Sequence, residues 1–152
     1  MVTVISSSAE ATESLGDQWA QEVGPGWVIA LTGDLGAGKT QLVRGLARGL
    51  GSPARVHSPT FNLLNIYRGG RLPLYHVDLY RLPTEAAVWE AGLDAYLVTD
   101  GVTVIEWAER LGCGGWPRWA PEPARLRRVW MEVTGPSERR IAYEDAGPGF
   151  FG

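Results

Sequence analysis

Apolar residues recur along this chain in two patterns, one typical of helices and one typical of strands. The helical pattern, with apolar residues three or four positions apart, occurs in three segments. In the first, Leu15 and Trp19 fall on one face of an amphipathic helix. The second ends at Gly51, a typical stop signal, and the third has Pro83 near its start. The predicted helices are residues 9–23, 40–51 and 83–92.

Short runs rich in apolar and β-branched residues predict strands between and after these helices. Residues 61–67 and 72–78 flank the letters RGGR, which is typical of a β-hairpin. The segment 125–145 is predicted to form two strands joined at GPSE. The remaining predicted strands are residues 26–33 and 100–107. This order of elements predicts an α/β layer fold with a mixed sheet.

Length and composition place limits on the class of protein. With 152 residues, 45% of them hydrophobic and 20% charged, we expect one globular domain, 1–152, with residues 146–152 as a loose tail. No apolar run approaches the roughly 20 residues of a membrane span, and the N-terminus lacks signal-peptide features. One cysteine, Cys113, allows no intrachain disulfide. We therefore expect a cytoplasmic protein without a membrane partner.

The letters GDLGAGKT, residues 33–40, match the spacing of a phosphate-binding loop, G-x-x-x-x-G-K-[ST]. The match lies between a predicted strand and a predicted helix, which is the context that this loop requires. Backbone N–H groups and the helix N-terminus bind phosphates in such loops, and the Ser/Thr hydroxyl binds Mg²⁺. The predicted nucleotide-binding residues are Gly33, Asp34, Leu35, Gly36, Ala37, Gly38, Lys39 and Thr40.

Lys39 is the only lysine beside thirteen arginines. A phosphate loop needs a compact ammonium between the phosphates, which a planar guanidinium does not replace. The guanine-reading motif N-K-x-D needs another lysine, so a Ras-like GTPase is disfavoured and ATP is the expected nucleotide. The net charge of −3 argues against a stand-alone nucleic-acid-binding protein.

Three further side chains are candidates for the chemistry of the site. A phosphate loop needs a carboxylate on the magnesium side at the end of a buried strand, and both Asp78 and Glu106 fit. Either could instead cap a helix or pair with an arginine, and spacing alone does not rank them. Thr60, in SPTF, is similar to a switch threonine that senses the γ-phosphate, although Ser-Pro-Thr is also ordinary turn chemistry.

The remaining polar and aromatic residues leave alternatives open. His76 points to the same side of its strand as Asp78, in either a polar role or a core position. Cys/His spacing predicts no zinc site. The tryptophans are expected mostly in the core, with Trp116 and Trp119 alternatively a lid or partner contact. A cluster of arginines on the last hairpin is either a solvated face or a contact to nucleotide or RNA: Arg125, Arg127, Arg128, Arg139 and Arg140.

Four segments in order resemble the TsaE (YjeE) family very closely: GDLGAGKTQLVRGLARGLG, VHSPTFNLLNIY, YHVDLYRL and VIEWAERL. These are bacterial P-loop ATPases of tRNA threonylcarbamoyladenosine synthesis, and the resemblance runs from about Thr12 to Arg140. It implies a P-loop NTPase-like three-layer sandwich, with a mixed central sheet and flanking helices.

The resemblance also implies roles and partners. Residues 36–41, including Gln41, would hold ATP, with Thr12 near the adenine and Trp107 beside the nucleotide. Thr40 and Glu106 would bind Mg²⁺. The implied catalytic residues are Lys39, Thr60, Asp78 and Glu106. The implied partners are TsaB and TsaD, through which the protein meets tRNA indirectly, and ATP turnover would reset that complex between cycles.

Two other functions remain open from the sequence. A small-molecule kinase would use the same phosphate loop with an acceptor pocket and an arginine-bearing lid, for which only residues 112–124, with Arg118, could serve. A nucleotide-binding scaffold would bind ATP without turnover.

Overall fold

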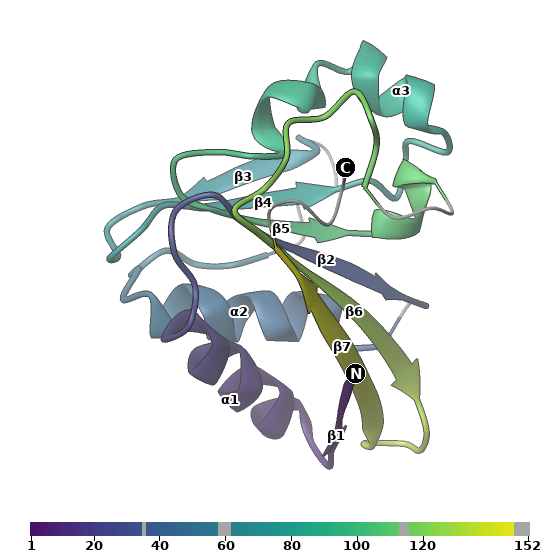
Figure 1. Cartoon of the computed structure of the whole chain (residues 1–152). Coiled ribbons are helices and arrows are strands. Elements are labelled where there is room, and N and C mark those ends of the chain that lie inside the picture. Colours follow the sequence, from purple (N-terminus) through teal and green to yellow (C-terminus); the bar gives the residue numbers. More distant parts are fainter. Residues whose placement is uncertain (35, 58–61, 113–115, 148–152) are drawn as a thin grey trace.

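The computed structural model describes residues 1–34, 36–57, 62–112 and 116–147. This part of the chain forms one seven-stranded mixed sheet with helices on both faces (Figure 1). The strand order is β1-β7-β6-β2-β5-β4-β3, and the central strands β6, β2, β5 and β4 are parallel. The strands are β1(Val2–Ser6), β2(Trp27–Gly33), β3(Leu64–Tyr67), β4(Leu74–Asp78), β5(Val102–Glu106), β6(Arg125–Val133) and β7(Arg139–Ala146). The predicted α/β class with a mixed sheet is confirmed.

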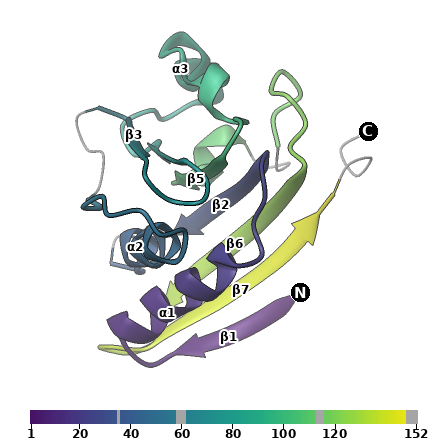
Figure 2. The ribbon, with the colours of Figure 1, turned by 90° about the vertical axis from the view of Figure 1, so that its left-hand side faces the viewer.

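Two long helices, α1(Ala9–Ala20) and α2(Lys39–Gly49), cover one face of the sheet (Figures 1 and 2). The side chain of Ser8 caps α1 by accepting a hydrogen bond from the Ala11 N–H at 3.0 Å. The helices approach so closely that a Cβ on Gly45 would lie 1.9 Å from the Glu13 carbonyl oxygen. Glycine at this position therefore lets α1 pack directly on α2, the helix that begins at the phosphate loop.

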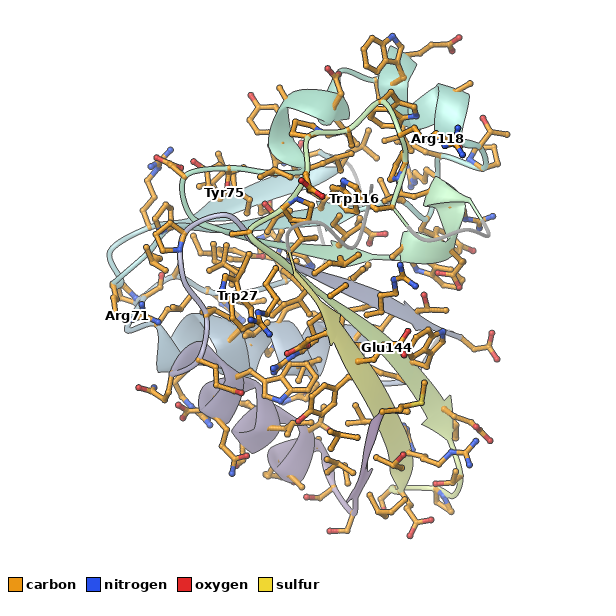
Figure 3. All side chains as sticks on the ribbon, in the orientation of Figure 1. Trp27, Arg71, Tyr75, Trp116, Arg118 and Glu144 are labelled. Atoms are coloured by element: carbon orange, nitrogen blue, oxygen red, sulfur yellow. The ribbon has the colours of Figure 1, made fainter. Side chains whose placement is uncertain are left out.

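The other face carries shorter elements, α3(Glu85–Glu90), η1(Leu93–Tyr96) and η2(Ala108–Leu111). Alternation along β2 supplies both cores, because Ile29 and Leu31 pack with α1 and α2 while Val28 packs with the shorter elements. Figure 3 shows Trp27 on the α1 side of the sheet and Trp116 on the α3 side.

Several sequence predictions are confirmed and others need correction. The hairpins β3–β4 and β6–β7 form as predicted. The helix predicted over 9–23 ends at Ala20, and that predicted over 83–92 covers only Glu85–Glu90, with the Thr84 side chain as its cap. The strand β1, which the sequence analysis missed, pairs antiparallel with β7. Cys113, Thr60, Leu35 and residues 148–152 lie outside the described residues.

Two of the tryptophans are less buried than predicted. Trp89 is 53% exposed and Trp130 38% exposed, so the expectation of a core position is wrong for both. Trp116 and Trp119 pack against the core of the α3 side, where the Trp119 indole N–H donates to the Glu85 carboxylate. In the described residues, no helix is long and apolar enough to cross a membrane.

The arginines of the last hairpin do not form a free basic patch. Arg127 is buried between Asp145 and Glu22, while Arg128 pairs with Glu144 and Arg140 with Glu132. Carboxylates on β7, on β6 and just after α1 therefore neutralise most of the predicted cluster. For Arg127, both expected environments, a solvated face and an RNA or nucleotide contact, are wrong.

Candidate nucleotide site

The phosphate loop connects β2 to α2 at the carboxyl ends of the parallel strands, as its motif predicts. Gly38 immediately precedes the helix with φ of 97°, a left-handed conformation that favours glycine. Of the loop, Leu35 lies outside the described residues. The N-terminus of α2 therefore carries its unpaired N–H groups toward the edge of the sheet where ligands bind in this class of fold.

A cleft of about 460 Å³ lies over this helix N-terminus. Residues of the phosphate loop form one side, and side chains that follow β4 and β5 form the other. It is lined by Gly36, Ala37, Gly38, Lys39, Thr40, Gln41, Arg44, Leu63, Asp78, Tyr80, Arg81, Glu106 and Trp107. The structure thus brings most of the predicted nucleotide-binding residues together with both candidate carboxylates.

Lys39 lies at the base of this cleft and is nearly buried. Its ammonium donates hydrogen bonds to the carbonyl oxygens of Gly33 and Asp34, the latter at 3.1 Å, and lies 3.9 Å from the centre of the Trp107 ring. Burial lowers the pKa of Lys39, and nearby carboxylates, Glu106 first, partly oppose that shift. Gly33 and Asp34 therefore hold the lysine through their carbonyls and do not line the cleft.

The Thr40 hydroxyl and the Glu106 carboxylate meet across the cleft. Thr40 Oγ1 lies 3.1 Å from Glu106 Oε2 and 3.3 Å from Oε1. Asp78 stands directly opposite Glu106 in the parallel register of β4 and β5, and its carboxylate accepts the Tyr80 N–H at 2.9 Å. Of the two candidate carboxylates, Glu106 is therefore the one in contact with the phosphate-loop threonine.

The donor set fits a magnesium ion that arrives with a nucleotide. Mg²⁺ prefers oxygen ligands, and in nucleotide sites it takes few of them from the protein and the rest from phosphates and water. The Thr40 hydroxyl and Glu106 carboxylate supply two such oxygens beside the phosphate loop. Within the described ranges, no three His, Cys, Asp or Glu side chains gather into a metal-binding group. The chemistry therefore fits a shared ion better than a cage made by the protein alone.

Thr12 lies beside the phosphate loop and lines a second cavity of about 240 Å³. Its hydroxyl is within 2.7 Å of the Ser6 hydroxyl, and it is buried. Gly38 and Gln41 line both this cavity and the main cleft. Arg139 also lines it and donates from Nε to the Gly36 carbonyl at 3.1 Å, which ties the β6–β7 turn to the phosphate loop.

Sequence reasoning missed some site residues and left the role of another open. Tyr80 and Arg81 line the cleft, and the signal for both was their place directly after the Asp78 strand. His76, whose role was left open, bonds from Nε2 to Glu106 at 2.5 Å and from Nδ1 to the Tyr67 hydroxyl at 2.9 Å. Tyr67 gave no functional signal of its own.

Comparisons with known proteins identify the family of this chain. A family model described as threonylcarbamoyl adenosine biosynthesis protein TsaE matches residues 6–140. A TsaE protein of Bacillus subtilis is 37% identical over 138 residues, which cover 91% of this chain and 82% of that protein. A TsaE protein of Synechocystis is 50% identical over 108 residues, or 66% of each chain.

The fold is similar to that of a solved protein as well. The crystal structure of Bacillus subtilis YdiB superposes with a TM-score of 0.75 at 32% identity, covering 96% of this chain and 85% of that one. The family model spans most of the chain. The chain therefore belongs to the TsaE family of tRNA threonylcarbamoyladenosine biosynthesis proteins.

Proposed function

We propose that this protein binds ATP with Mg²⁺ in the main cleft and hydrolyses it as the ATPase of the machinery that forms N6-threonylcarbamoyladenosine in tRNA. TsaB and TsaD are its proposed partners, and tRNA reaches it only through them. The observation that carries the proposal is the contact between Thr40 and Glu106 at the N-terminus of α2, beside the only lysine of the chain.

The phosphates would lie against the backbone N–H groups of residues 36–40, where the dipole of α2 favours negative charge. Lys39 would turn from the Gly33 and Asp34 carbonyls to the phosphates, whose charge favours its protonated form. The cavity beside Thr12 would take the base, because Gly38 and Gln41 line both this cavity and the cleft.

Thr40 and Glu106 would hold Mg²⁺, which neutralises charge on the phosphates when it is bound. Asp78 would orient the attacking water, since its carboxylate lines the same cleft opposite Glu106. Trp107 would cover the Lys39 side of the phosphates, and Thr60 would respond to the γ-phosphate. The roles of Thr40, Glu106 and Asp78 place charged or polar groups where charge develops during phosphoryl transfer.

A small-molecule kinase receives less support. Arg118, proposed for an arginine-bearing lid, does not line the cleft in the described residues, whose arginines there are Arg44 and Arg81. Incubation with ATP and candidate acceptors separates the two functions, because a phosphorylated small molecule would favour the kinase.

The decisive experiment measures phosphate release from ATP by this protein alone and with purified TsaB–TsaD. We expect slow release alone and clear stimulation by the partners, since part of the site can be ordered only in the complex. Absence of stimulation, together with full tRNA modification when this protein is left out, would overturn the proposal. Binding of ATP without turnover in either condition would favour a scaffold.

A further inference from the structure

A chain of buried hydrogen bonds lies behind the Glu106 carboxylate. It crosses three neighbouring strands, from Glu106 on β5 through His76 on β4 to Tyr67 on β3. The Tyr67 hydroxyl continues the chain to the backbone carbonyl of His57, at 3.1 Å. His76 is fully buried, and Tyr67 and Glu106 are 4% and 3% exposed. Such a buried set is costly unless its members satisfy one another.

Hydrogen-bond accounting gives the direction of the bond between His76 and Glu106. The Tyr67 hydroxyl has one proton, and it can donate that proton either to the His57 carbonyl or to His76 Nδ1. In the first case both ring nitrogens of His76 donate, and in the second only Nε2 does. An ionised carboxylate can only accept. Toward an ionised Glu106, His76 therefore donates from Nε2 in both cases.

The contacts of Glu106 show what this donation accomplishes. His76 binds Oε2, while the Thr40 hydroxyl is shared between Oε2 at 3.1 Å and Oε1 at 3.3 Å. A glutamate side chain has several rotatable bonds, so a fixed donor behind one oxygen limits the directions in which the other can face. Donors of this kind orient the ligands of many metal sites.

We propose that His76 is a positioning residue, which holds Glu106 so that its carboxylate and the Thr40 hydroxyl meet Mg²⁺ together. Tyr67 anchors His76 from the other side. This inference rests on the proposed function, because it assigns His76 a part in the binding of the magnesium ion of a nucleotide. The alternative is a histidine that only fills and satisfies the core.

The test measures ADP affinity by calorimetry with the full chain, once with excess Mg²⁺ and once with a chelator. The wild type is expected to bind ADP more tightly with Mg²⁺. His76→Leu removes the donor, and we expect it to lose about tenfold of the magnesium-dependent gain, as for other outer-sphere partners of metal ligands. Affinity in the chelator should stay unchanged. His76→Gln returns an N–H near the position of Nε2 and should restore part of the gain.

Two further variants keep the test sharp if His76→Leu does not fold. Tyr67→Phe removes only the hydroxyl, and a smaller loss of the same gain is expected, on the order of the fivefold that one hydrogen bond is worth. Tyr75→Phe is the matched control, since Tyr75 is the neighbour of His76 on β4. Its hydroxyl donates to Asp100, which does not belong to the hydrogen-bonded set of Glu106, His76 and Tyr67. Its magnesium-dependent gain should equal that of the wild type.

The outcomes separate this inference from the proposed function. A wild type that binds ADP equally with and without Mg²⁺ would count against the magnesium site itself. A clear gain in the wild type that stays equal in His76→Leu and Tyr67→Phe would overturn the positioning role alone. Loss of ADP affinity by the same factor with and without Mg²⁺ would also overturn it, because only a structural role predicts that result.

Discussion

Two buried polar clusters lie on the face of the sheet that α1 and α2 cover, one around Arg127 and one around Glu106. Arg127 stands opposite Ile29 in the register of β6 and β2, near the start of the parallel strands. Glu106 is the last residue of β5, at the carboxyl edge of these strands. Arg127 binds Asp145 through Nε and Nη2, at 2.8 and 2.9 Å, and its guanidinium lies 4.6 Å from the Tyr143 ring centre. The guanidinium of Arg127 bonds to carboxylates within the cluster, and it does not line the cavities described above. We call this the closed cluster.

The Glu106 cluster differs because one side of it opens into the cleft. Its carboxylate is held from behind by His76 and meets Thr40 at the phosphate loop. Ligands of parallel α/β sheets bind at the carboxyl ends of the strands, which is where this cluster lies. Burial of charge is therefore a poor guide to function on its own, and the position along the strand together with an open side separates the two cases.

The largest effect should come from the closed cluster and concern stability. Arg127→Met removes a guanidinium whose pKa is raised, because hydrogen bonds to Asp145 and Glu22 outweigh the desolvation of burial. We expect a loss of about 3 kcal/mol in the free energy of unfolding, the low end for a broken buried pair, since both carboxylates reach solvent. Denaturant unfolding measures this loss.

Arg140→Ala is the matched control, because Arg140 pairs with Glu132 on the surface of the same hairpin. A cost under about 1 kcal/mol is expected for such an exposed pair. ADP affinity of the folded Arg127→Met protein should equal that of the wild type. Reduced affinity, or equal destabilisation by both substitutions, would break the distinction between the clusters.

A smaller effect is expected from the open cluster, on binding. Trp107→Ala removes a ring that lines the cleft beside Lys39, and we expect the nucleotide-bound protein to lose an aromatic contact to the Lys39 ammonium worth about 1–2 kcal/mol. ADP affinity should therefore fall by roughly five- to thirtyfold. Trp107→Phe retains an aromatic face and should lose less. An unchanged affinity in Trp107→Ala, measured by calorimetry, would remove Trp107 from the proposed site.

The smallest effect concerns pH and a third buried group. Burial raises the pKa of Tyr75 above 10.0, and its hydrogen bond to Asp100 at 3.0 Å adds to that shift. The native state therefore binds the phenolic proton more tightly than the unfolded state does. This contribution to stability is complete below pH 10.0 and is lost as the pH rises through the folded-state pKa.

Thermal unfolding of wild type and Tyr75→Phe across this range measures the effect. The stability of the wild type should fall further on passing pH 10.0, by about 1 kcal/mol at most, the value of one hydrogen bond. Parallel pH profiles for the two proteins would contradict the assignment. Because Tyr75 does not line the cleft, the Tyr75→Phe protein should bind ADP at neutral pH as tightly as the wild type does.

Local patterns were enough to predict the elements that form the cleft. The phosphate loop sits between β2 and α2 as its spacing requires, and the runs before Asp78 and Glu106 are strands. The strand β1 was missed because a five-residue segment becomes a strand only through its pairing with β7 at the other end of the chain. Strand order of this kind depends on contacts that no local pattern contains.

The partners of the side chains in the two polar clusters could not be predicted from local patterns either. Glu22 and Arg127 are 105 residues apart, so the arginines of the last hairpin gave the impression of a basic patch. His76 and Glu106 meet because β4 and β5 are parallel neighbours, a pairing that the sequence did not specify. Residue types at the site were therefore predictable, while the partners that hold them in place required the assembled sheet.

The proposal at the centre of this account is that ATP hydrolysis at the open cluster sustains repeated cycles of tRNA modification. Its most direct test replaces wild-type protein with Lys39→Ala in a reaction with TsaB and TsaD, in which ATP, tRNA and an activated threonylcarbamoyl donor are supplied in excess, and follows threonylcarbamoyladenosine over time. We predict that modification continues with the wild type and stops after at most one round with Lys39→Ala, although the variant remains folded. Equal rates and extents of modification with the two proteins, with complex assembly also unchanged, would contradict the account.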